Sequence, residues 1–247
     1  MQFWSLTDYL PYESVRQLQL RLVELRVLDQ IPDTILFLEH SPVITRGRGL
    51  QFTGEARPRH MPVPALIPPG IEFTETERGG DLTYHGPGQL VIYPICKMDG
   101  TGFAPERDLA VFLRKTEGLL IQELKDRGLA AGTQDSATGV WIGSKKVASI
   151  GIAVRKWVSF HGMAINVVND LAPFSLISPC GFSPEVMTRL KDWLPLTESW
   201  RDDLESALAR RFMPAAPIRV EKMTLSEAHA RLESRTFSAS SLPSMIP

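Results

Sequence analysis

The sequence predicts a protein of the α/β or α+β class, in which helices pack on a β-sheet. Runs with β-strand character come in blocks, and stretches with helical spacing of apolar residues are inserted between them. The chain has 247 residues, of which 43% are hydrophobic, so it is long enough to bury a sizeable core. A regular doubly wound repeat is not expected, because strands and helices do not alternate one by one.

The first half of the chain predicts one helix among several strands. Residues 11–28 are expected to be helical, because Val15, Leu18 and Leu22 fall on one face. Strands are expected at residues 2–6, 34–38, 71–77, 83–84 and 89–96, with a Gly/Pro turn between the last two. Residues 45–49 predict a Gly- and Arg-rich turn, and residues 57–70, which hold five prolines, an irregular loop.

The second half predicts the longest helix and a β-hairpin. The helix covers residues 107–127 and carries Phe112, Leu120 and Leu124 at helical spacing. The hairpin joins strands at residues 139–142 and 146–154, and a further strand follows at residues 160–168. Helices are expected at residues 184–190 and 197–212, and a small strand and helix at residues 218–222 and 226–234, beyond two prolines.

Composition and charge exclude several classes of function. The net charge of −1 argues against a nucleic-acid-binding protein that relies on a strong basic field. Two cysteines cannot build a disulfide framework, and no cluster of residues has metal-ligand spacing. The N-terminus lacks the basic and apolar regions of a signal peptide, and no apolar run approaches the ~18 residues that span a membrane. We therefore expect a cytoplasmic protein without metal or cofactor, which binds neither nucleic acid nor membrane.

A cysteine and a lysine are the residues most suggestive of chemistry. Cys180 stands between Pro179 and Gly181, a setting typical of an exposed turn. A thiol attacks as its thiolate, which a nearby ammonium favours, so Lys146 is the expected partner. Lys145 and Lys146 sit at the start of a predicted strand, where neighbouring side chains point to opposite faces. One lysine can therefore face solvent while the other faces a site.

The glycine-rich stretch from Arg78 to Gln89 is a second candidate site. Its glycines let the main chain approach a ligand closely, and Arg78 is suited to a phosphate or carboxylate. A glycine-rich hairpin that binds nothing fits the composition equally well. The stretch lacks the Gly-Lys-Ser/Thr of a Walker loop and the strand-to-helix context of a dinucleotide-binding fingerprint.

Two histidines are candidate bases for Cys180. His161 follows a predicted strand residue and precedes small residues, and His85 stands in the glycine-rich stretch. A structural, hydrogen-bonded histidine is the alternative for each. Cys96 lies in an apolar strand and is expected to serve packing only.

Five pieces of the sequence follow one another in a characteristic order. They are Arg78-Gly79-Gly80, Tyr84-His85-Gly86-Pro87-Gly88-Gln89, Lys146-Val147-Ala148-Ser149-Ile150-Gly151, His161-Gly162-Met163-Ala164-Ile165-Asn166-Val167 and Pro179-Cys180-Gly181. In this order and spacing they resemble the bacterial lipoyl(octanoyl) transferases, the lipoate biosynthesis protein B family. Residues 39–43 resemble an early motif of the same family. The resemblance covers residues 1–212 and is highly specific because the Cys and Lys are both in place.

This resemblance implies a fold related to the biotin and lipoate protein ligases, with a mixed sheet flanked by helices and a smaller second sheet. Residues 1–212 would form the catalytic domain, and residues 213–247 a C-terminal extension with a flexible end. The implied reaction moves an octanoyl group from octanoyl-acyl carrier protein to a lysine of a lipoyl domain, the first step of protein lipoylation. The implied acceptors are lipoyl domains of 2-oxoacid dehydrogenase E2 subunits and the glycine cleavage H protein.

The resemblance also assigns roles to residues. Cys180 matches the nucleophile that carries the acyl group as a thioester in a ping-pong cycle, and Lys146 matches the lysine that lowers its pKa. The residues that match the acyl pocket are Arg78, Gly79, Gly80, Asp81, Leu82, Thr83, Tyr84 and His85, then Ser149, Ile150 and Gly151, then Gly162, Met163 and Ala164. Backbone N–H groups of Gly181 and of the glycines near His161 are candidates for holding the oxyanion. Lys146, His85 and His161 are all candidates for taking the proton of the acceptor lysine.

Four other functions stay open on the sequence. An ATP-dependent lipoate or biotin protein ligase has a similar fold but needs no cysteine. A Cys-His hydrolase would need His85 or His161 beside Cys180. A non-catalytic module would only hold an acyl chain, and a related amidotransferase would move octanoyl between lipoyl-bearing proteins. The Arg-Gly-Gly and Tyr-His-Gly-Pro-Gly-Gln pieces favour the carrier-protein enzyme over the amidotransferase.

Overall fold

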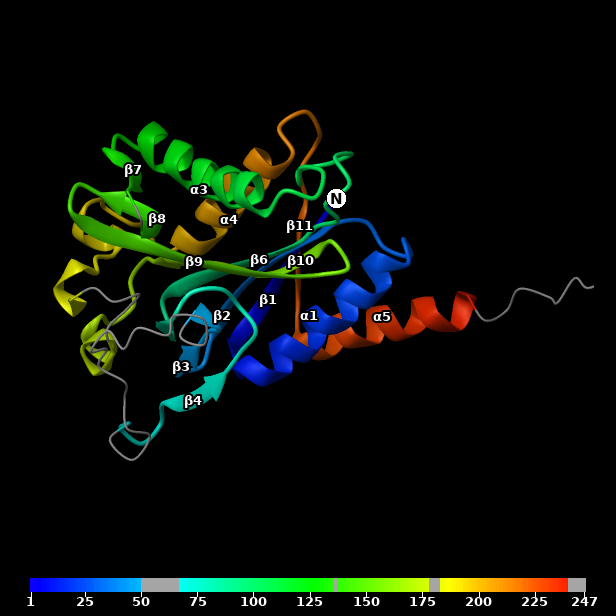
Figure 1. Ribbon diagram of the computed structural model, residues 1–247, viewed down its shortest axis with the longest axis horizontal. Coiled ribbons are helices and arrows are strands. Elements are labelled where there is room, and N and C mark those ends of the chain that lie inside the picture. The colour runs from blue at the N-terminus through cyan, green and yellow to red at the C-terminus, as the bar shows by residue number, and fades with distance from the viewer. Residues whose placement is uncertain (50–66, 136, 178–182, 240–247) are drawn as a thin grey trace, which may run out of the picture.

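The protein has a large β-sheet with helices on both faces and a small sheet beside it (Figure 1). A computed structural model describes residues 1–49, 67–135, 137–177 and 183–239. The predicted fold class, a mixed sheet flanked by helices with a smaller second sheet, is confirmed.

The large sheet is mixed. Within the described residues it has eight strands, in the order β11-β1-β2-β6-β10-β9-β8-β7. Their bounds are β1 Gln2–Leu10, β2 Thr34–His40, β6 Gln89–Ile95, β7 Ala131–Gln134, β8 Ala137–Ile142, β9 Lys145–Arg155, β10 Val158–Asn166 and β11 Val220–Met223. β1 runs parallel to β2 and β11, whereas the other neighbouring strands are antiparallel. Every residue of β2, β6 and β10 is buried, because helices cover both faces of the sheet.

Two pairs of helices cover these faces (Figure 1). α1 (Tyr12–Val27) and α5 (Leu225–Ala239) pack on one face, and α3 (Leu109–Asp126) and α4 (Trp200–Phe212) pack on the other. The apolar stripe predicted on α1 is confirmed, since Val15, Leu18 and Leu22 are fully buried. Each face thus has its own apolar cluster, and these clusters hold the strands that carry the site.

The small sheet has the strand order β4-β3-β5. Its bounds are β3 Val43–Arg46, β4 Glu72–Glu75 and β5 Leu82–His85. It packs on a third apolar cluster that includes Phe174, Ile177 and Met187. Tyr12, the first residue of α1, stacks on His85 of the small sheet at 6.1 Å and on His161 of the large sheet at 6.3 Å. The two sheets therefore meet at the start of α1.

Three predictions about local structure were wrong or incomplete. The expected turn at residues 45–49 overlaps β3, and β7 was not foreseen, because four-residue strands give little periodicity. The helix expected at residues 184–190 is absent from those described residues, which hold a 3-10 turn at Pro184–Val186. Met187 pairs with Lys146 of β9 instead, so tertiary pairing prevails over local propensity. Most of the loop expected at residues 57–70 lies outside the described residues.

The C-terminal segment is packed on the same large sheet. β11 pairs in parallel with β1, and α5 packs against α1 and β1. The Arg231 guanidinium lies over the ring of Trp4, 5.5 Å from its centre, and also pairs with Glu221. The predicted small strand and helix are confirmed, with slightly different bounds. Residues 240–247, for which flexibility is expected, lie outside the described part of the chain.

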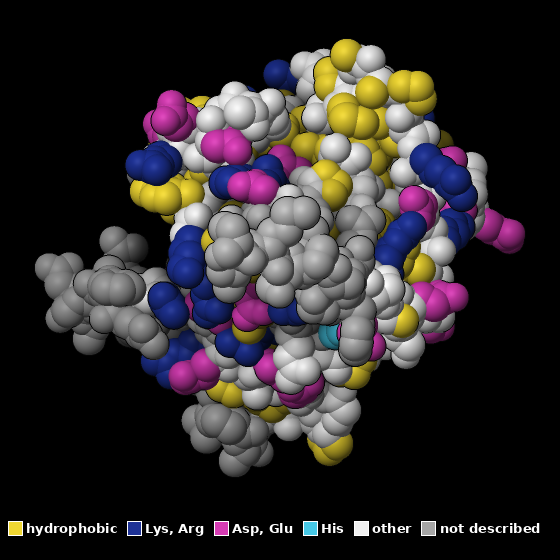
Figure 2. Space-filling model, turned by 90° about the vertical axis from the view of Figure 1, so that its right-hand side faces the viewer, with side chains coloured by type: hydrophobic (Ala, Val, Ile, Leu, Met, Phe, Trp, Pro, Cys, Tyr) yellow, Lys and Arg dark blue, Asp and Glu magenta, His cyan; other side chains and the backbone are white. Residues whose placement is uncertain are grey.

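The surface carries charges of both signs. On the face in Figure 2, Lys and Arg side chains are interspersed with Asp and Glu, and hydrophobic patches lie between them. This mixture agrees with the net charge of −1 and shows no broad field of one sign on that face. Among the described helices, none is both long and apolar enough to cross a membrane.

Candidate active site

A cavity lies where the large and small sheets meet. It is narrow, with a volume of about 30 Å³, and its walls come from α1, β5, β6, β9, β10 and the residues just before β5. The residues that line it are Tyr12, Arg78, Gly80, Thr83, His85, Val91, Tyr93, Ser149, Ile150, Gly151, His161, Gly162, Met163 and Ala164. Residues of all three stretches that the sequence predicts for a pocket therefore meet at one cavity.

Four predicted pocket residues do not line this cavity. Leu82 and Tyr84 point to the other face of β5 and join the apolar cluster around Phe174, because side chains alternate along a strand. Gly79 and Asp81 contribute backbone instead, since their carbonyl oxygens accept hydrogen bonds from the Arg78 guanidinium.

Three other lining residues, Tyr12, Val91 and Tyr93, were not predicted from the sequence. Val91 and Tyr93 alternate along β6, which is buried throughout, so its sequence does not reveal which face borders a cavity. Tyr12 opens a helix whose remaining apolar residues serve the core. Their roles become visible only when the sheets are brought together.

The floor of the cavity is made by small residues of β9 and β10. Gly151 pairs with Gly162, and Ser149 pairs with Ala164, in the antiparallel register of these strands. The glycines serve close backbone packing: a Cβ on Gly162 would collide with the carbonyl oxygen of Ile92, and one on Gly151 would lie 2.6 Å from the carbonyl oxygen of Gly79. The space that Gly162 leaves is thus taken by β6.

Arg78 holds the loop that covers the cavity. Its side chain is 7% exposed and donates hydrogen bonds to the carbonyl oxygen of Thr45 at 2.7 Å, to the Thr45 hydroxyl, and to the carbonyl oxygens of Gly79 and Asp81. A buried guanidinium with several acceptors is a rigid cross-link. It ties the residues before β5 to β3, so Arg78 shapes the wall of the cavity.

His85 lines the cavity and is held in one tautomer by its neighbours. Its Nδ1 lies 2.7 Å from Oε1 of Gln89, while Nε2 of Gln89 donates to the Tyr84 carbonyl and to Oδ1 of Asn166. Because the amide nitrogen of Gln89 faces two acceptors, its oxygen must accept from Nδ1–H of His85, which leaves a lone pair on Nε2. Burial lowers the pKa of His85 well below 6.5, so the ring is neutral at pH 7.

His161 is held by a more extensive network. Its backbone has φ +56° and its N–H donates to the side-chain oxygen of Gln19 on α1 at 2.7 Å. Its ring nitrogens lie 3.4 Å from the Tyr12 hydroxyl and 3.3 Å from the Thr76 hydroxyl, with Glu77 at 3.5 Å. Burial lowers the pKa of His161, and the neighbouring Glu77 carboxylate opposes this shift.

A third buried histidine, His40, completes the aromatic cluster around Tyr12. Nδ1 of His40 donates to the Leu10 carbonyl at 3.0 Å, and its Nε2 accepts from the Tyr93 hydroxyl at 2.8 Å. Full burial lowers the pKa of His40 to about 4. The residue belongs to the early motif noted in the sequence, but nothing in that motif indicated that it would reach the neighbourhood of the cavity.

Lys146 is buried at the start of β9, on the strand that forms the cavity floor. Its side chain is 1% exposed, whereas Lys145 is exposed, so the prediction that the two point to opposite faces is confirmed. The ammonium lies over the ring of Trp141 of β8, 5.6 Å from its centre. Within the described part of the chain, no carboxylate forms an ion pair with it.

Cys180 and Gly181 lie outside the described residues. The described residues on either side are anchored close to Lys146 or the small sheet: Ile177 is buried in the third apolar cluster, and the N–H of Thr188 donates to the Lys146 carbonyl at 2.9 Å. Cys96 is fully buried in the core, and burial raises its pKa well above 9.0, so the prediction that it serves packing is confirmed.

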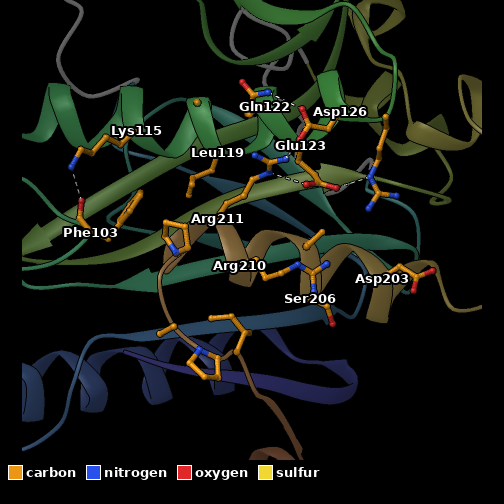
Figure 3. A pocket seen from close by; sticks show the side chains of 17 residues that line it. Phe103, Lys115, Leu119, Gln122, Glu123, Asp126, Asp203, Ser206, Arg210 and Arg211 are labelled. Carbon is orange, nitrogen blue, oxygen red and sulfur yellow. Dashed lines mark hydrogen bonds and ion pairs between the residues drawn. The ribbon is translucent and has the colours of Figure 1, made fainter.

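A second hollow lies on the opposite face of the sheet, between α3 and α4 (Figure 3). Its charged side chains pair with one another: Arg211 bonds Glu123 at 2.8 Å and Asp126 at 2.6 Å, and Arg127 also bonds Glu123. None of the residues that the sequence predicts for a site is among those lining it. Most of the predicted pocket residues and both candidate histidines therefore gather at the cavity between the sheets, whereas Lys146 is not among the residues that line it.

Comparison with known proteins places the chain in a family. Residues 11–213 match the family model "Lipoyl protein ligase A/B catalytic domain". An octanoyltransferase of Dictyoglomus thermophilum is 42% identical over 183 residues, which are 74% of each chain. An octanoyltransferase of Geobacter metallireducens is 43% identical over 172 residues, 70% of this chain and 74% of the relative.

Solved structures show the same fold at low sequence identity. A lipoate-protein ligase A bound with ATP superposes with a TM-score of 0.66 at 18% identity, covering 96% of this chain and 95% of that one. A bipartite lipoate protein ligase of Thermoplasma acidophilum gives 0.63 at 18% identity, covering 96% and 92%. The family model and the curated relatives show that the chain belongs to the lipoyl protein ligase A/B catalytic domain family, in its octanoyltransferase branch.

Proposed function

We propose that the protein transfers an octanoyl group from the thioester of octanoyl-acyl carrier protein to a lysine of a lipoyl domain, through an acyl thioester on Cys180. The proposal rests on one observation: β9 connects the buried lysine to the floor of the cavity. One strand supplies the buried Lys146 at its start and then Ser149 and Gly151 on the cavity floor. The octanoyltransferase relatives support the choice of acyl group.

The dimensions of β9 suit an eight-carbon chain. Lys146 and Ser149 are three residues apart, about 10 Å along a strand. An extended octanoyl chain is about 9 Å long at roughly 1.2 Å per bond. The lysine can therefore stand beside the thioester while the tail reaches the floor. Burial of about six methylenes would contribute roughly 5 kcal/mol, enough to discriminate among chain lengths.

Cys180 is the proposed nucleophile, with the Lys146 ammonium as its counter-charge. An ordinary thiol with a pKa near ~8.5 is only about 3% thiolate at pH 7. Lowering its pKa by ~2 units would raise the thiolate fraction roughly 25-fold, while intrinsic nucleophilicity would fall about 8-fold. The net gain in attack is small. The larger benefit comes when Cys180 must leave, because a thiol of lower pKa leaves faster.

The proposed reaction has two acyl-transfer steps. In the first, the Cys180 thiolate attacks the thioester carbonyl, the bond to the carrier sulfur breaks, and the carrier leaves as its thiol after taking a proton. In the second, the lysine amine attacks octanoyl-Cys180, a C–N bond forms, the bond to Cys180 breaks and the amine loses a proton. Thioester converts to amide without ATP. Lys146, His85 and His161 are candidates for the proton, and His85, whose Nε2 carries a lone pair, lines the cavity.

The biological setting is proposed from the family resemblance. Acceptors would be lipoyl domains of 2-oxoacid dehydrogenase E2 subunits and the glycine cleavage H protein, and the reaction would take place in the cytoplasm. Residues 1–212 would be the catalytic domain. Residues 213–247 would be an extension, which contributes β11 and α5 to the fold described above.

Intact-mass spectrometry tests this proposal. The full chain is mixed with octanoyl-acyl carrier protein, with octanoyl-lysine formation followed on an added lipoyl domain. We expect one octanoyl unit on the enzyme, its loss in Cys180→Ser, and modification of the domain without ATP. Product formation only from free octanoate and ATP would instead show a ligase. Release of free octanoate without an acceptor would show a hydrolase, and full activity of Cys180→Ala would exclude covalent catalysis by this residue.

A further inference from the structure

We propose that Glu117 and Gly139 form a seat that positions the side chain of Lys146, which makes both of them positioning residues for the reaction. This inference rests on the proposed function, in which Lys146 stabilises the Cys180 thiolate. The three residues come from α3, β8 and β9, and the contacts among them are all buried.

Gly139 makes room for the lysine. A Cβ at this position would lie 2.7 Å from Cε and 3.3 Å from Nζ of Lys146, and would collide with the carbonyl oxygen of Ala148. Its φ of +132° is also a backbone conformation that residues with side chains rarely adopt. The lysine therefore runs directly over a backbone position that only glycine can supply.

Strand pairing is irregular on both sides of Gly139. Val140 pairs with Ala148 but Trp141 pairs with Lys146, so Val147 is an extra residue, a β-bulge in β9. On the other side, the pairing of β8 with β7 shifts between Gly132 and Gln134. Bulges re-aim side chains, and this one sits immediately after Lys146.

Glu117 provides the hydrogen-bond acceptor for the N–H of Gly139 at this irregular position. The carboxylate is 1% exposed, and its Oε1 accepts the N–H of Gly139 at 3.0 Å. Its Oε2 bonds Arg114 at 2.7 Å, but that arginine side chain is 70% exposed. Since an exposed ion pair contributes little, a buried carboxylate at this place is best explained by its bond to Gly139.

The two carboxylate oxygens of Glu117 thus have different partners, so substitutions can separate their roles. Oε1 fixes Gly139, and Gly139 fixes the path of Lys146, whereas Oε2 serves an exposed arginine. Glu117→Gln keeps an oxygen that can accept from Gly139. Glu117→Asp keeps the charge but withdraws it by one methylene. Arg114→Ala removes only the exposed partner, and it is the matched control.

The test measures the rate of Cys180 alkylation by iodoacetamide as a function of pH, located by peptide mass, together with the rate of single-turnover acylation by octanoyl-acyl carrier protein. Cys96 is fully buried, so it gives little background. We expect Glu117→Asp to move the alkylation midpoint toward that of a free thiol, near ~8.5, and to lower both rates by up to about 3-fold at pH 7, because higher intrinsic nucleophilicity offsets most of the lost thiolate. Glu117→Gln and Arg114→Ala should keep the wild-type midpoint.

A wild-type alkylation midpoint in Glu117→Asp would overturn the seat. So would a Glu117→Gln variant whose midpoint shifts as far as that of Glu117→Asp, because keeping the acceptor for Gly139 would then not preserve the thiolate. Thermal unfolding of each variant identifies any loss that reflects unfolding, and the rates are compared at a temperature where all are folded. If the wild type is acylated on Cys180 but the variants do not differ, only the seat fails. If the wild type is not acylated on Cys180, the proposed function itself fails.

Discussion

Nδ1 of His85 donates a hydrogen bond to the side-chain oxygen of Gln89 over 2.7 Å, and this bond fixes which nitrogen of the imidazole carries the lone pair. The chain of bonds continues from Gln89 to Asn166 at 2.9 Å, and from Asn166 to the carbonyl of Thr188 at 3.0 Å. Thr188 in turn donates its N–H to Lys146. A buried network therefore links the histidine of the cavity to the backbone of the lysine.

Replacing Gln89 should cost considerable stability. Gln89→Leu leaves His85, the Tyr84 carbonyl and Asn166 without their buried partner, so we expect the free energy of unfolding to fall by about 2–4 kcal/mol. Urea unfolding measures this change. The control is Gln122→Leu, which removes only an exposed bond to Asp126 and should change stability by less than about 0.5 kcal/mol. Equal losses in the two variants would contradict a special role for the buried network.

Stability should fall as the pH drops from 7 toward 4, because buried neutral histidines resist protonation. The pKa of His40 is about 4 when folded against 6.5 in the reference state, so below pH 6.5 the unfolded chain takes up a proton that the folded chain does not. The stability this histidine contributes is therefore fully present above pH 6.5. About 2 kcal/mol of it is lost by pH 5, and His85 and His161 add in the same direction.

Urea unfolding at pH 7 and pH 5 checks this dependence, with His40→Gln as the comparison. The free energy of unfolding of His40→Gln should differ less between pH 7 and pH 5 than that of the wild type, whatever the variant's absolute stability. The Glu77 carboxylate acts in a lower window, because hydrogen bonding to His161 and to Arg16 lowers its pKa. Its contribution is present above the ordinary pKa of a carboxyl group, near ~4.3, and is lost only at more acidic pH. A protein equally stable at pH 5 and pH 7 would contradict burial of neutral histidines.

Gly162 should tolerate no side chain. Gly162→Ala would drive a methyl group into the carbonyl oxygen of Ile92 on the neighbouring strand, so we expect a loss of at least about 2–3 kcal/mol in urea unfolding. Gly118→Ala is the matched control, since a Cβ there meets nothing within 4 Å on the exposed side of α3. That change should raise stability by about 0.5–1 kcal/mol, because alanine favours a helix. A stable Gly162→Ala protein would mean that β6 and β10 are less closely packed.

Removing the charge of Lys146 should affect chemistry more than folding. Lys146→Met keeps the length of the side chain, and it removes a buried ammonium that has no ion-pair partner in the described residues, so we expect unchanged or slightly higher stability. The midpoint of Cys180 alkylation should rise by about 2 pH units, toward ~8.5. Lys145→Met, at the exposed neighbour, should change neither quantity measurably. An unshifted midpoint in Lys146→Met would show that Lys146 does not lower the pKa of Cys180.

The sequence predicted those parts of the fold that repeat a regular pattern. The apolar stripe of Val15, Leu18 and Leu22 predicted α1. The alternation of side chains along a strand predicted that Lys145 and Lys146 point in opposite directions. The glycine-rich and small-residue stretches located most of the cavity, although Leu82 and Tyr84 face away from it.

Other features depend on single-residue irregularities that no periodicity reveals. The bulge at Val147 and the φ of +56° at His161 each shift side chains between faces. The aromatic cluster of Tyr12, His40 and His161 joins residues that are far apart in the sequence, so it becomes visible only in the folded chain. Gly139 and Glu117 escaped notice for the same reason, because a glycine and a glutamate carry no signal of what packs over them.

Transfer through Cys180 requires that the acylated enzyme itself donates its octanoyl group to the acceptor. Octanoyl-enzyme, freed of carrier protein, can be mixed rapidly with a lipoyl domain and both masses followed over time. We expect the enzyme to lose one octanoyl unit while the domain gains one on a lysine, at a rate no slower than steady-state turnover. An octanoyl-enzyme that keeps its acyl group, or loses it only to water, would rule out transfer through Cys180.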